Sequence, residues 1–296
     1  MLTVRAPATS ANLGSGFDVF GVALDRPGDV VRVERAERTT IEITGVGSQF
    51  IPEDPTKNTA GVVARELDAP AEIHIDKGVR PASGLGSSAA SAAAAAVALN
   101  ELYDRGLSGE ELVRVAAEGE AAVSGDAHAD NVAPSILGGF TVVTDERVLH
   151  TDTDIPLVAC LPESVVSTRD ARGVIPEQVS LDAVTDVVGS ASTLVTGMHR
   201  DDTELVGAGM DDGVVTPARA ELIDGYDDVV AAASEAGATG VTVSGSGPSV
   251  LAVPRTQSQT RAVAAAMVRA FEEAGVDARA FQTRVGSGAE ILSERE

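Results

Sequence analysis

Short stretches in which apolar and polar residues alternate recur through the first half of the chain. They are rich in β-branched side chains, which is typical of strands with one buried face. These strands are expected at residues 30–34, 40–44, 71–76 and 140–143. Segments with helical spacing separate them, at residues 58–67, 87–100 and 108–123. The last begins with Ser108-Gly109-Glu110-Glu111, which has the spacing of a capping box.

Longer helical stretches dominate the second half of the chain. Helices are expected at residues 181–198, 219–236 and 260–274. Strands are expected near Leu157 and at residues 250–253 and 278–282. The order predicts an α+β protein, and its 296 residues are enough for two domains. We place the boundary near residue 155, giving an N-terminal domain of residues 1–155 and a C-terminal domain of residues 156–296.

The charge of the chain is strongly negative. Asp and Glu number 45 against 22 Lys and Arg, for a formal net charge of −23. Such a surface repels nucleic acid, so no nucleic-acid partner is expected. The carboxylates are spread along the whole chain, and Lys57 and Lys77 are the only lysines. We interpret this as the acidic surface of a protein from a salt-rich cytoplasm, where about molar salt shortens the Debye length to about 3 Å.

The chain has no feature of a membrane or secreted protein. It contains no run of about 18 apolar residues, and residues 1–5 lack the apolar core of a signal peptide. A cytoplasmic location without membrane contact is therefore expected. Cys160 is the only cysteine, which excludes an internal disulfide and a cysteine-based zinc site. Because it lies in an apolar run, we expect a buried, inert thiol.

A glycine-rich loop joins the expected strand at 71–76 to the helix that follows. Residues 81–90 read Pro-Ala-Ser-Gly-Leu-Gly-Ser-Ser-Ala-Ala. Gly84 and Gly86 allow successive amides to turn toward an anion, and a helix N-terminus adds unpaired N–H donors. Ser87 and Ser88 offer oxygens for phosphate or magnesium, although no Walker A ending is present. The alternative is an ordinary helix N-cap after a flexible turn.

Three further segments carry polar residues suited to a binding site. Residues 7–18 read Pro-Ala-Thr-Ser-Ala-Asn-Leu-Gly-Ser-Gly-Phe-Asp, and residues 128–134 read His-Ala-Asp-Asn-Val-Ala-Pro. Residues 244–247 form a second glycine cluster, Ser-Gly-Ser-Gly. Taken singly, each has a plainer interpretation: a polar turn, a surface imidazole and a loop.

Together and in this order, the motifs resemble those of the GHMP family of small-molecule kinases, and the resemblance covers essentially the whole chain. It implies the α+β GHMP kinase fold, with an N-terminal ribosomal protein S5 domain 2-like domain and a C-terminal ferredoxin-like domain. It also implies transfer of a phosphoryl group from ATP to a small alcohol. Residues 7–18 and 128–134 are most similar to those of the homoserine kinases within the family.

The resemblance implies which residues hold ATP and Mg²⁺. The expected ATP contacts are Asn58, Pro81, Ser83, Gly84, Leu85, Gly86, Ser87, Ser88, Ala89, Gly245, Ser246 and Gly247. Ser88 and Glu120 are the expected magnesium ligands, an oxygen pair that suits a hard cation which keeps several waters. Glu118 lies about 200° around the helix from Glu120 and should face elsewhere.

The resemblance also implies an acceptor site. Asp18, helped by Asn12, would bind the ammonium of the substrate, and Arg172 and Arg219 its carboxylate. The residues expected around the reacting hydroxyl are His128, Asn131 and Thr168, of which Asn131 and Thr168 are the catalytic candidates. Asp130 is a weak candidate for a general base, because homoserine kinases are generally described as working without one.

The function that the resemblance implies is phosphorylation of L-homoserine to O-phospho-L-homoserine, a step of threonine synthesis. The alternative is a family kinase for another alcohol, such as mevalonate or shikimate. A degenerate member that only binds is disfavoured because Ser88, Glu120 and the loop glycines are all present. The expected partners are ATP and L-homoserine, and a homodimer is compatible with the sequence.

Overall fold

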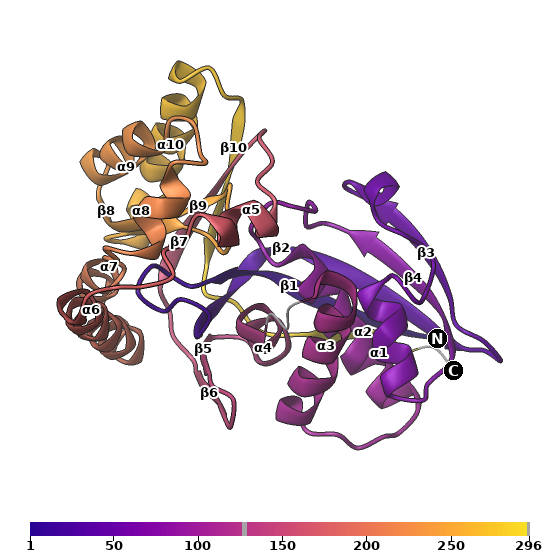
Figure 1. Ribbon diagram of the computed structural model, residues 1–296. Coiled ribbons are helices and arrows are strands. Elements are labelled where there is room, and N and C mark those ends of the chain that lie inside the picture. Colours follow the sequence, from indigo (N-terminus) through magenta and orange to yellow (C-terminus); the bar gives the residue numbers. More distant parts are fainter. Residues whose placement is uncertain (126–128, 295–296) are drawn as a thin grey trace.

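The computed structural model describes residues 1–125 and 129–294, which form two sheets with helices packed against each (Figure 1). The first sheet has seven strands in the order β11-β1-β2-β4-β3, with β5 pairing to β2 and to β6. Its strands are β1 (Leu2–Ala11), β2 (Phe20–Arg35), β3 (Thr40–Gly45), β4 (Ala71–Lys77), β5 (Phe140–Val143), β6 (Val148–Thr151) and β11 (Glu290–Glu294). Neighbouring strands are antiparallel except for the parallel pair β3 and β4.

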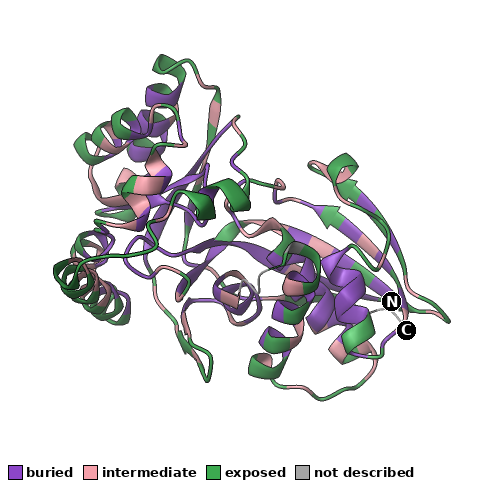
Figure 2. Ribbon diagram, viewed as in Figure 1, coloured by how far each residue is buried: buried purple, intermediate pink, exposed green. Residues whose placement is uncertain are grey.

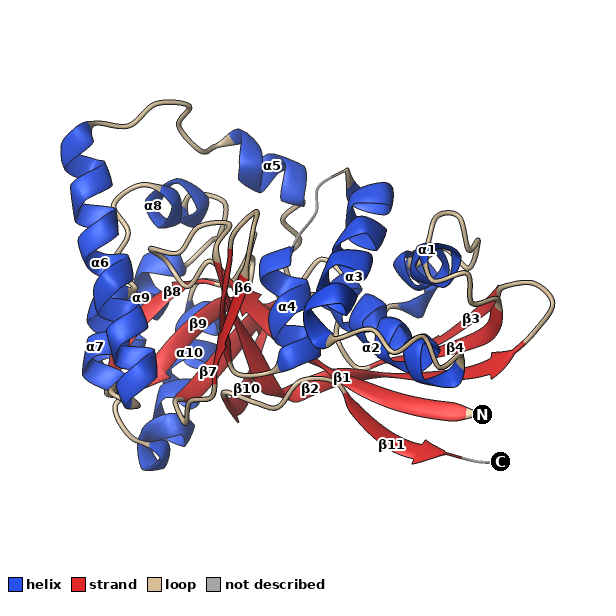
Figure 3. Cartoon of the chain, turned by 90° about the horizontal axis from the view of Figure 1, so that it is seen from below, coloured by secondary structure: helices blue, strands red, loops and turns tan. Residues whose placement is uncertain are grey.

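Four helices lie on one face of the first sheet (Figure 3). They are α1 (Thr59–Glu66), α2 (Ser87–Leu102), α3 (Gly109–Ser124) and α4 (Ala129–Leu137). Every alanine of α2 is buried, so this helix packs closely against β1 and β2. The capping box that opens α3 is confirmed, because the Ser108 hydroxyl accepts from the Glu111 amide and the Glu111 carboxylate accepts from the Ser108 amide.

The second sheet has four antiparallel strands in the order β10-β7-β9-β8. They are β7 (Pro156–Pro162), β8 (Ala238–Val243), β9 (Val250–Pro254) and β10 (Ala278–Arg284). The helices of this half are α5 (Thr168–Gly173), α6 (Leu181–Arg200), α7 (Thr203–Gly209), α8 (Val215–Ala220), α9 (Tyr226–Glu235) and α10 (Thr260–Glu273). Two short 3₁₀ turns are also present, η1 (Ser48–Phe50) in the first half of the chain and η2 (Gln257–Gln259) in the second. Buried residues concentrate in the sheets and on the helix faces that cover them (Figure 2).

The two halves share part of their core. One cluster of buried side chains includes Leu13 and Leu24 from the first half together with Leu157 and Leu251 from the second. The chain also returns to the first sheet at its end, because β11 pairs with β1. The division at residues 155 and 156 stays a prediction, and residues 290–294 lie in the sheet of the N-terminal half.

Several elements differ from the sequence prediction, which did not include β6, β8, β11, α4, α5 and α7. The single helix expected over residues 219–236 is wrong, because the chain turns between α8 and α9, where Gly225 has a φ of 81°. The strand β1 was not predicted, because nine of its ten residues are buried and the alternation that marks a half-exposed strand is absent. Among the described residues, no helix is both long and apolar enough to cross a bilayer.

Candidate active site

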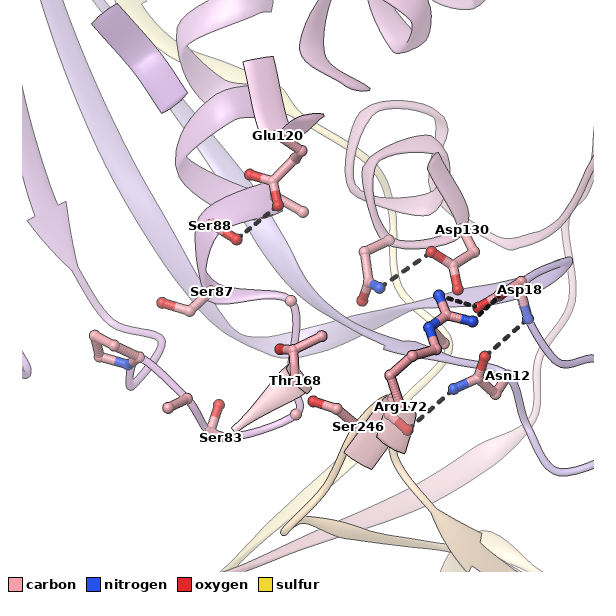
Figure 4. Close-up of a pocket in the computed structure, with 18 of the residues that line it drawn as sticks. Asn12, Asp18, Ser83, Ser87, Ser88, Glu120, Asp130, Thr168, Arg172 and Ser246 are labelled. Atoms are coloured by element: carbon pink, nitrogen blue, oxygen red, sulfur yellow. Dashed lines mark hydrogen bonds and ion pairs between the residues drawn. The ribbon is translucent and has the colours of Figure 1, made fainter. Parts of the chain in front are cut away.

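A polar cavity of about 220 Å³ lies where the glycine loop, α3, α4 and α5 meet (Figure 4). Its wall combines segments from both halves of the chain, from Ala11 in β1 to Ser246 in the second glycine cluster. The phosphate loop, defined here as residues 78–86 between β4 and α2, forms one side. Carboxylates and guanidinium groups gather on the opposite side.

Glycines are required in the phosphate loop by both conformation and space. Gly84 and Gly86 have φ angles of 77° and 63°, in the left-handed region. A Cβ on Gly86 would lie 2.0 Å from the Thr9 hydroxyl, and one on Gly84 would lie 2.5 Å from the Ser244 carbonyl oxygen. No side chain of the described residues caps the start of α2. The first amides of this 16-residue helix are therefore available to an anion.

A hydroxyl and a carboxylate meet beside the start of α2. The Ser88 hydroxyl donates to Glu120 Oε2 over 2.8 Å, which joins α2 to α3. Glu120 is only 2% exposed, whereas Ser88 is exposed, and both line the cavity. Glu118 is exposed and lies outside the cavity wall, as its position on the helix predicts.

An ion pair closes the opposite side of the cavity. Arg172 donates from Nη1 to Asp18 Oδ2 over 2.6 Å and from Nη2 to Asp18 Oδ1 over 3.3 Å. Asn12 holds the backbone of Asp18, since its Oδ1 accepts from the Asp18 amide and its Nδ2 donates to the Gly245 carbonyl, each over 3.0 Å. The two residues that were expected to hold opposite charges of the substrate are thus in direct contact.

Arg219 lies deeper than Arg172. It is 5% exposed, and its Nη1 donates to the Gly245 carbonyl over 2.6 Å. Burial lowers the pKa of the Arg219 guanidinium below its usual value, and the negative charge of Asp18 opposes this shift. The ring of Phe17 contacts both arginines, with centroid distances of 5.1 Å to the Arg172 guanidinium carbon and 5.2 Å to that of Arg219. Two cations therefore converge on one end of the cavity.

Small polar groups lie between these two sides. Asn131 accepts from the Thr9 hydroxyl over 2.9 Å and donates from Nδ2 to Asp130 Oδ1 over 3.3 Å. Thr168 opens α5 and faces the same space. These amide and hydroxyl groups can hydrogen-bond an alcohol or a phosphoryl oxygen.

Most of the predicted site residues meet at this cavity. Those that line it are Asn12, Asp18, Pro81, Ser83, Gly84, Gly86, Ser87, Ser88, Ala89, Glu120, Asn131, Thr168, Arg172, Arg219, Gly245 and Ser246. Asn58, Leu85 and Gly247 do not line it. Asn58 instead caps α1 by accepting from the Ala60 amide, and the Leu85 side chain is buried in the core. His128 lies outside the described residues, so its role stays a prediction.

The structure adds cavity residues that sequence reasoning did not select for binding. Ile51 and Ala82 both line the wall. Ala82 has a φ of 53°, an unusual conformation for alanine that nothing in the sequence indicates. Ile51 follows η1, a turn that residue periodicity does not reveal.

Two family patterns match this chain. The pattern described as "GHMP kinases N terminal domain" covers residues 55–139, and "GHMP kinases C terminal" covers residues 194–273. The chain belongs to the GHMP kinase family. It is also 70% identical over 292 residues to a homoserine kinase of Haloarcula marismortui, covering 99% of this chain and 100% of the relative. A homoserine kinase of Methanocella arvoryzae is 50% identical over 297 residues, covering 100% and 98% of the two chains.

Solved structures of GHMP kinases share the fold. The crystal structure of a homoserine kinase from Cytophaga hutchinsonii has a TM-score of 0.89 at 36% identity and covers 98% of this chain and 97% of that one. A mevalonate kinase of L. major, in complex with R-mevalonate, has a TM-score of 0.75 at 15% identity over 96% and 95% of the two chains, which shows likeness of fold alone. The expected α+β GHMP kinase fold is confirmed, and membership of this kinase family implies the use of ATP.

Proposed function

We propose that this GHMP kinase transfers the γ-phosphoryl group of ATP to the side-chain hydroxyl of L-homoserine. The observation that carries the proposal is the set of charges opposite the phosphate loop, Asp18 beside Arg172 and Arg219. One carboxylate and two guanidinium groups match the ammonium and carboxylate of an amino acid. The full-length relatives of high identity that are named homoserine kinases support the same substrate.

We propose that the phosphates of ATP lie on the phosphate loop and on the start of α2. Loop amides and helix N-termini bind anions through unpaired N–H groups and the helix dipole. The Ser88 hydroxyl and the Glu120 carboxylate fit a magnesium ion, because both are oxygen ligands on the same part of the wall. Within the described residues no group of three His, Cys, Asp or Glu side chains could hold a metal alone. Two protein oxygens with phosphate and water oxygens are the coordination that Mg²⁺ prefers in kinases.

The protein contributes mainly alignment and charge in this proposal. Bound Mg²⁺ would neutralise negative charge on the transferring phosphoryl group. Asp18 and the two arginines would fix the amino acid at both charged groups, so that its hydroxyl points toward the phosphate loop. Asn131 and Thr168 would contact the hydroxyl and the phosphoryl oxygens between them. Asp130 already accepts from Asn131, which favours a role in orienting this amide over that of a base.

An assay of ADP formation with different alcohols tests the proposed acceptor. We expect homoserine to support turnover at about molar KCl, with O-phosphohomoserine as the product observed by phosphorus NMR. Mevalonate and shikimate should support little or none, because neither has an ammonium for Asp18. Phosphorylation of either of these alcohols, with homoserine inactive, would reject the assignment.

We also propose a cytoplasmic location and a homodimer. The most exposed apolar side chains of α6 support the second, since Leu181 is 80% exposed and Val188 is 59% exposed in a protein whose surface is otherwise rich in carboxylates. Light scattering of the purified protein at high salt measures the oligomeric state directly, and a monomeric mass would reject the homodimer.

A further inference from the structure

We propose that a buried ion pair behind the active site, between Lys77 and Asp29, positions the phosphate loop for the nucleotide. Neither residue lines the cavity, so both act as positioning residues and neither is catalytic. The inference rests on the proposed binding of ATP phosphates by this loop. It does not depend on which alcohol accepts the phosphoryl group.

The ion pair is removed from solvent and fully hydrogen-bonded. The side chains of Lys77 and Asp29 are 1% and 0% exposed. The Lys77 ammonium donates to the Asp29 carboxylate, to the Ser91 hydroxyl over 2.8 Å and to the Ser87 carbonyl over 2.6 Å. An ammonium has three protons, so these three acceptors use all of them. Ser87 and Ser91 belong to the start of α2, so Lys77 ties the end of β4 to this helix.

The carboxylate of the pair holds the other end of the loop. Asp29 Oδ1 accepts from the amides of Gly78 and Val79, each over 3.0 Å. Its Oδ2 accepts from the Ser91 hydroxyl over 2.8 Å as well as from Lys77. Both ends of the phosphate loop are therefore anchored on one ion pair. In addition, the Ser87 hydroxyl donates across the loop to the Val79 carbonyl over 2.8 Å.

Stability alone gives little reason for such a pair. Desolvation of two charges offsets much of their attraction, and well-packed apolar residues can replace buried ion pairs with no loss of stability. What apolar residues cannot replace is the set of directed bonds to the loop amides and to the first turn of α2. The geometry thus points to placement of the loop as the contribution of Lys77 and Asp29.

The choice of lysine supports the same conclusion. Lys57 and Lys77 are the only lysines among 22 cationic side chains, and the remainder are arginine. The Lys57 side chain is 72% exposed, whereas that of Lys77 is 1% exposed. A planar guanidinium is larger and presents its donors in a fixed fork, which does not fit three acceptors around a compact buried site. We therefore expect arginine to be a poor replacement for Lys77.

A double variant tests the inference without leaving an unpaired buried charge. In the variant that combines Lys77→Met with Asp29→Asn, we expect the Kd for ADP to rise about tenfold or more, as measured by calorimetry with Mg²⁺. A rise of this size corresponds to the loss of one or two charged hydrogen bonds. The KM for ATP should rise in parallel, while the KM for homoserine stays within about twofold. Lys77→Arg should recover only part of the affinity, and Ser91→Ala should give a smaller shift in the same direction. Lys57→Met removes an exposed lysine and should leave every value unchanged.

A folded double variant that binds ADP as tightly as the parent protein would overturn the inference. If the double variant does not fold, the Ser91→Ala variant tests the inference instead. An unchanged ADP affinity in Ser91→Ala would then reject the role of the ion pair and its hydrogen bonds in positioning the loop. Gly86→Ala separates this failure from failure of the proposed function, because its new Cβ would strike the Thr9 hydroxyl and distort the loop directly. Weaker ADP binding in Gly86→Ala with unchanged binding in the network variants would leave the phosphate loop as the nucleotide site and reject only the ion pair.

Discussion

Asp18 and Arg172 bond to each other through two hydrogen bonds of 2.6 Å and 3.3 Å, although one comes from the loop after β1 and the other from α5. The pair joins the two halves of the chain across the cavity. An amino acid carries the same two charges, so its ammonium and carboxylate can exchange with this pair and leave both protein groups satisfied. An alcohol with a carboxylate but no ammonium would leave Asp18 without a partner.

This exchange predicts the effect of removing the Asp18 charge. In Asp18→Asn, we expect the KM for homoserine to rise about 10- to 100-fold, which corresponds to a lost charged hydrogen bond of about 1.5–3 kcal/mol. The KM for ATP should stay unchanged, because the phosphate loop lies on the other side of the cavity. Steady-state kinetics with each substrate varied in turn measures both values. An equal rise in both KM values would show that the substitution had disturbed the phosphate loop as well as the acceptor site, and would contradict a role confined to the acceptor.

Glu120 and Glu118 form a matched pair for testing the magnesium site. Glu120→Gln keeps the size of the side chain but removes the charge beside Ser88, and we expect kcat to fall about 10²- to 10³-fold. Glu118→Gln removes the same charge from the exposed side of α3 and should change kcat by less than about twofold. The Mg²⁺ concentration that gives half-maximal rate should increase only in the first variant. Full activity of Glu120→Gln would reject the proposed ligand.

Substitution of Asp130 distinguishes a mechanism that uses a general base from one that does not. Asp130→Asn retains a side-chain oxygen close to the amide of Asn131, and we expect kcat to fall less than about tenfold, because general-base catalysis contributes about 10²- to 10⁴-fold. A kcat reduced beyond about 10²-fold, with both substrates still bound, would identify Asp130 as the base.

The sequence predicted those parts of the fold and of the site whose structure depends on residues close together in the chain. The strand, glycine turn and helix around residues 71–100 follow from β-branched alternation and from Gly84 and Gly86, which adopt positive φ angles without strain. The cavity residues that belong to the sequence motifs were likewise predicted, because each motif is a contiguous segment of the chain. Each of these features depends on neighbours within about ten positions.

Features that depend on tertiary contact were not predicted. The contact between Asp18 and Arg172 joins residues 154 positions apart, and no local pattern links them. Strand β1 is buried on both faces, so periodicity could not reveal it. The ion pair of Asp29 and Lys77 was not predicted either. Its two residues lie far apart in the sequence, and each alone looks like an ordinary charge near a strand end.

The acidic surface predicts stabilisation by salt. Raising KCl from about 0.1 M to about 1 M shortens the Debye length from about 10 Å to about 3 Å and so screens the repulsion within a chain of net charge −23. We expect the Tm to rise by about 5 °C or more over this range. Calorimetry at several KCl concentrations measures the shift, with sucrose of equal osmolality as the control for general crowding. A Tm that does not depend on KCl would contradict this interpretation of the composition.

The buried thiol of Cys160 is expected to make the unfolding free energy depend on pH in the alkaline range. The thiol is fully buried in β7, and burial raises its pKa from the ordinary value of 9.0 to about 12. Because the folded state favours the neutral thiol, its contribution to stability is complete below pH 9.0 and is lost as the pH rises toward 12. Iodoacetamide at about pH 8 should therefore leave the native protein unmodified and label it in denaturant, as mass spectrometry can show. In Cys160→Ala, this part of the dependence of the unfolding free energy on alkaline pH should be absent. Rapid labelling of the native parent protein would contradict the prediction, because it would show that the thiol is accessible and ionised.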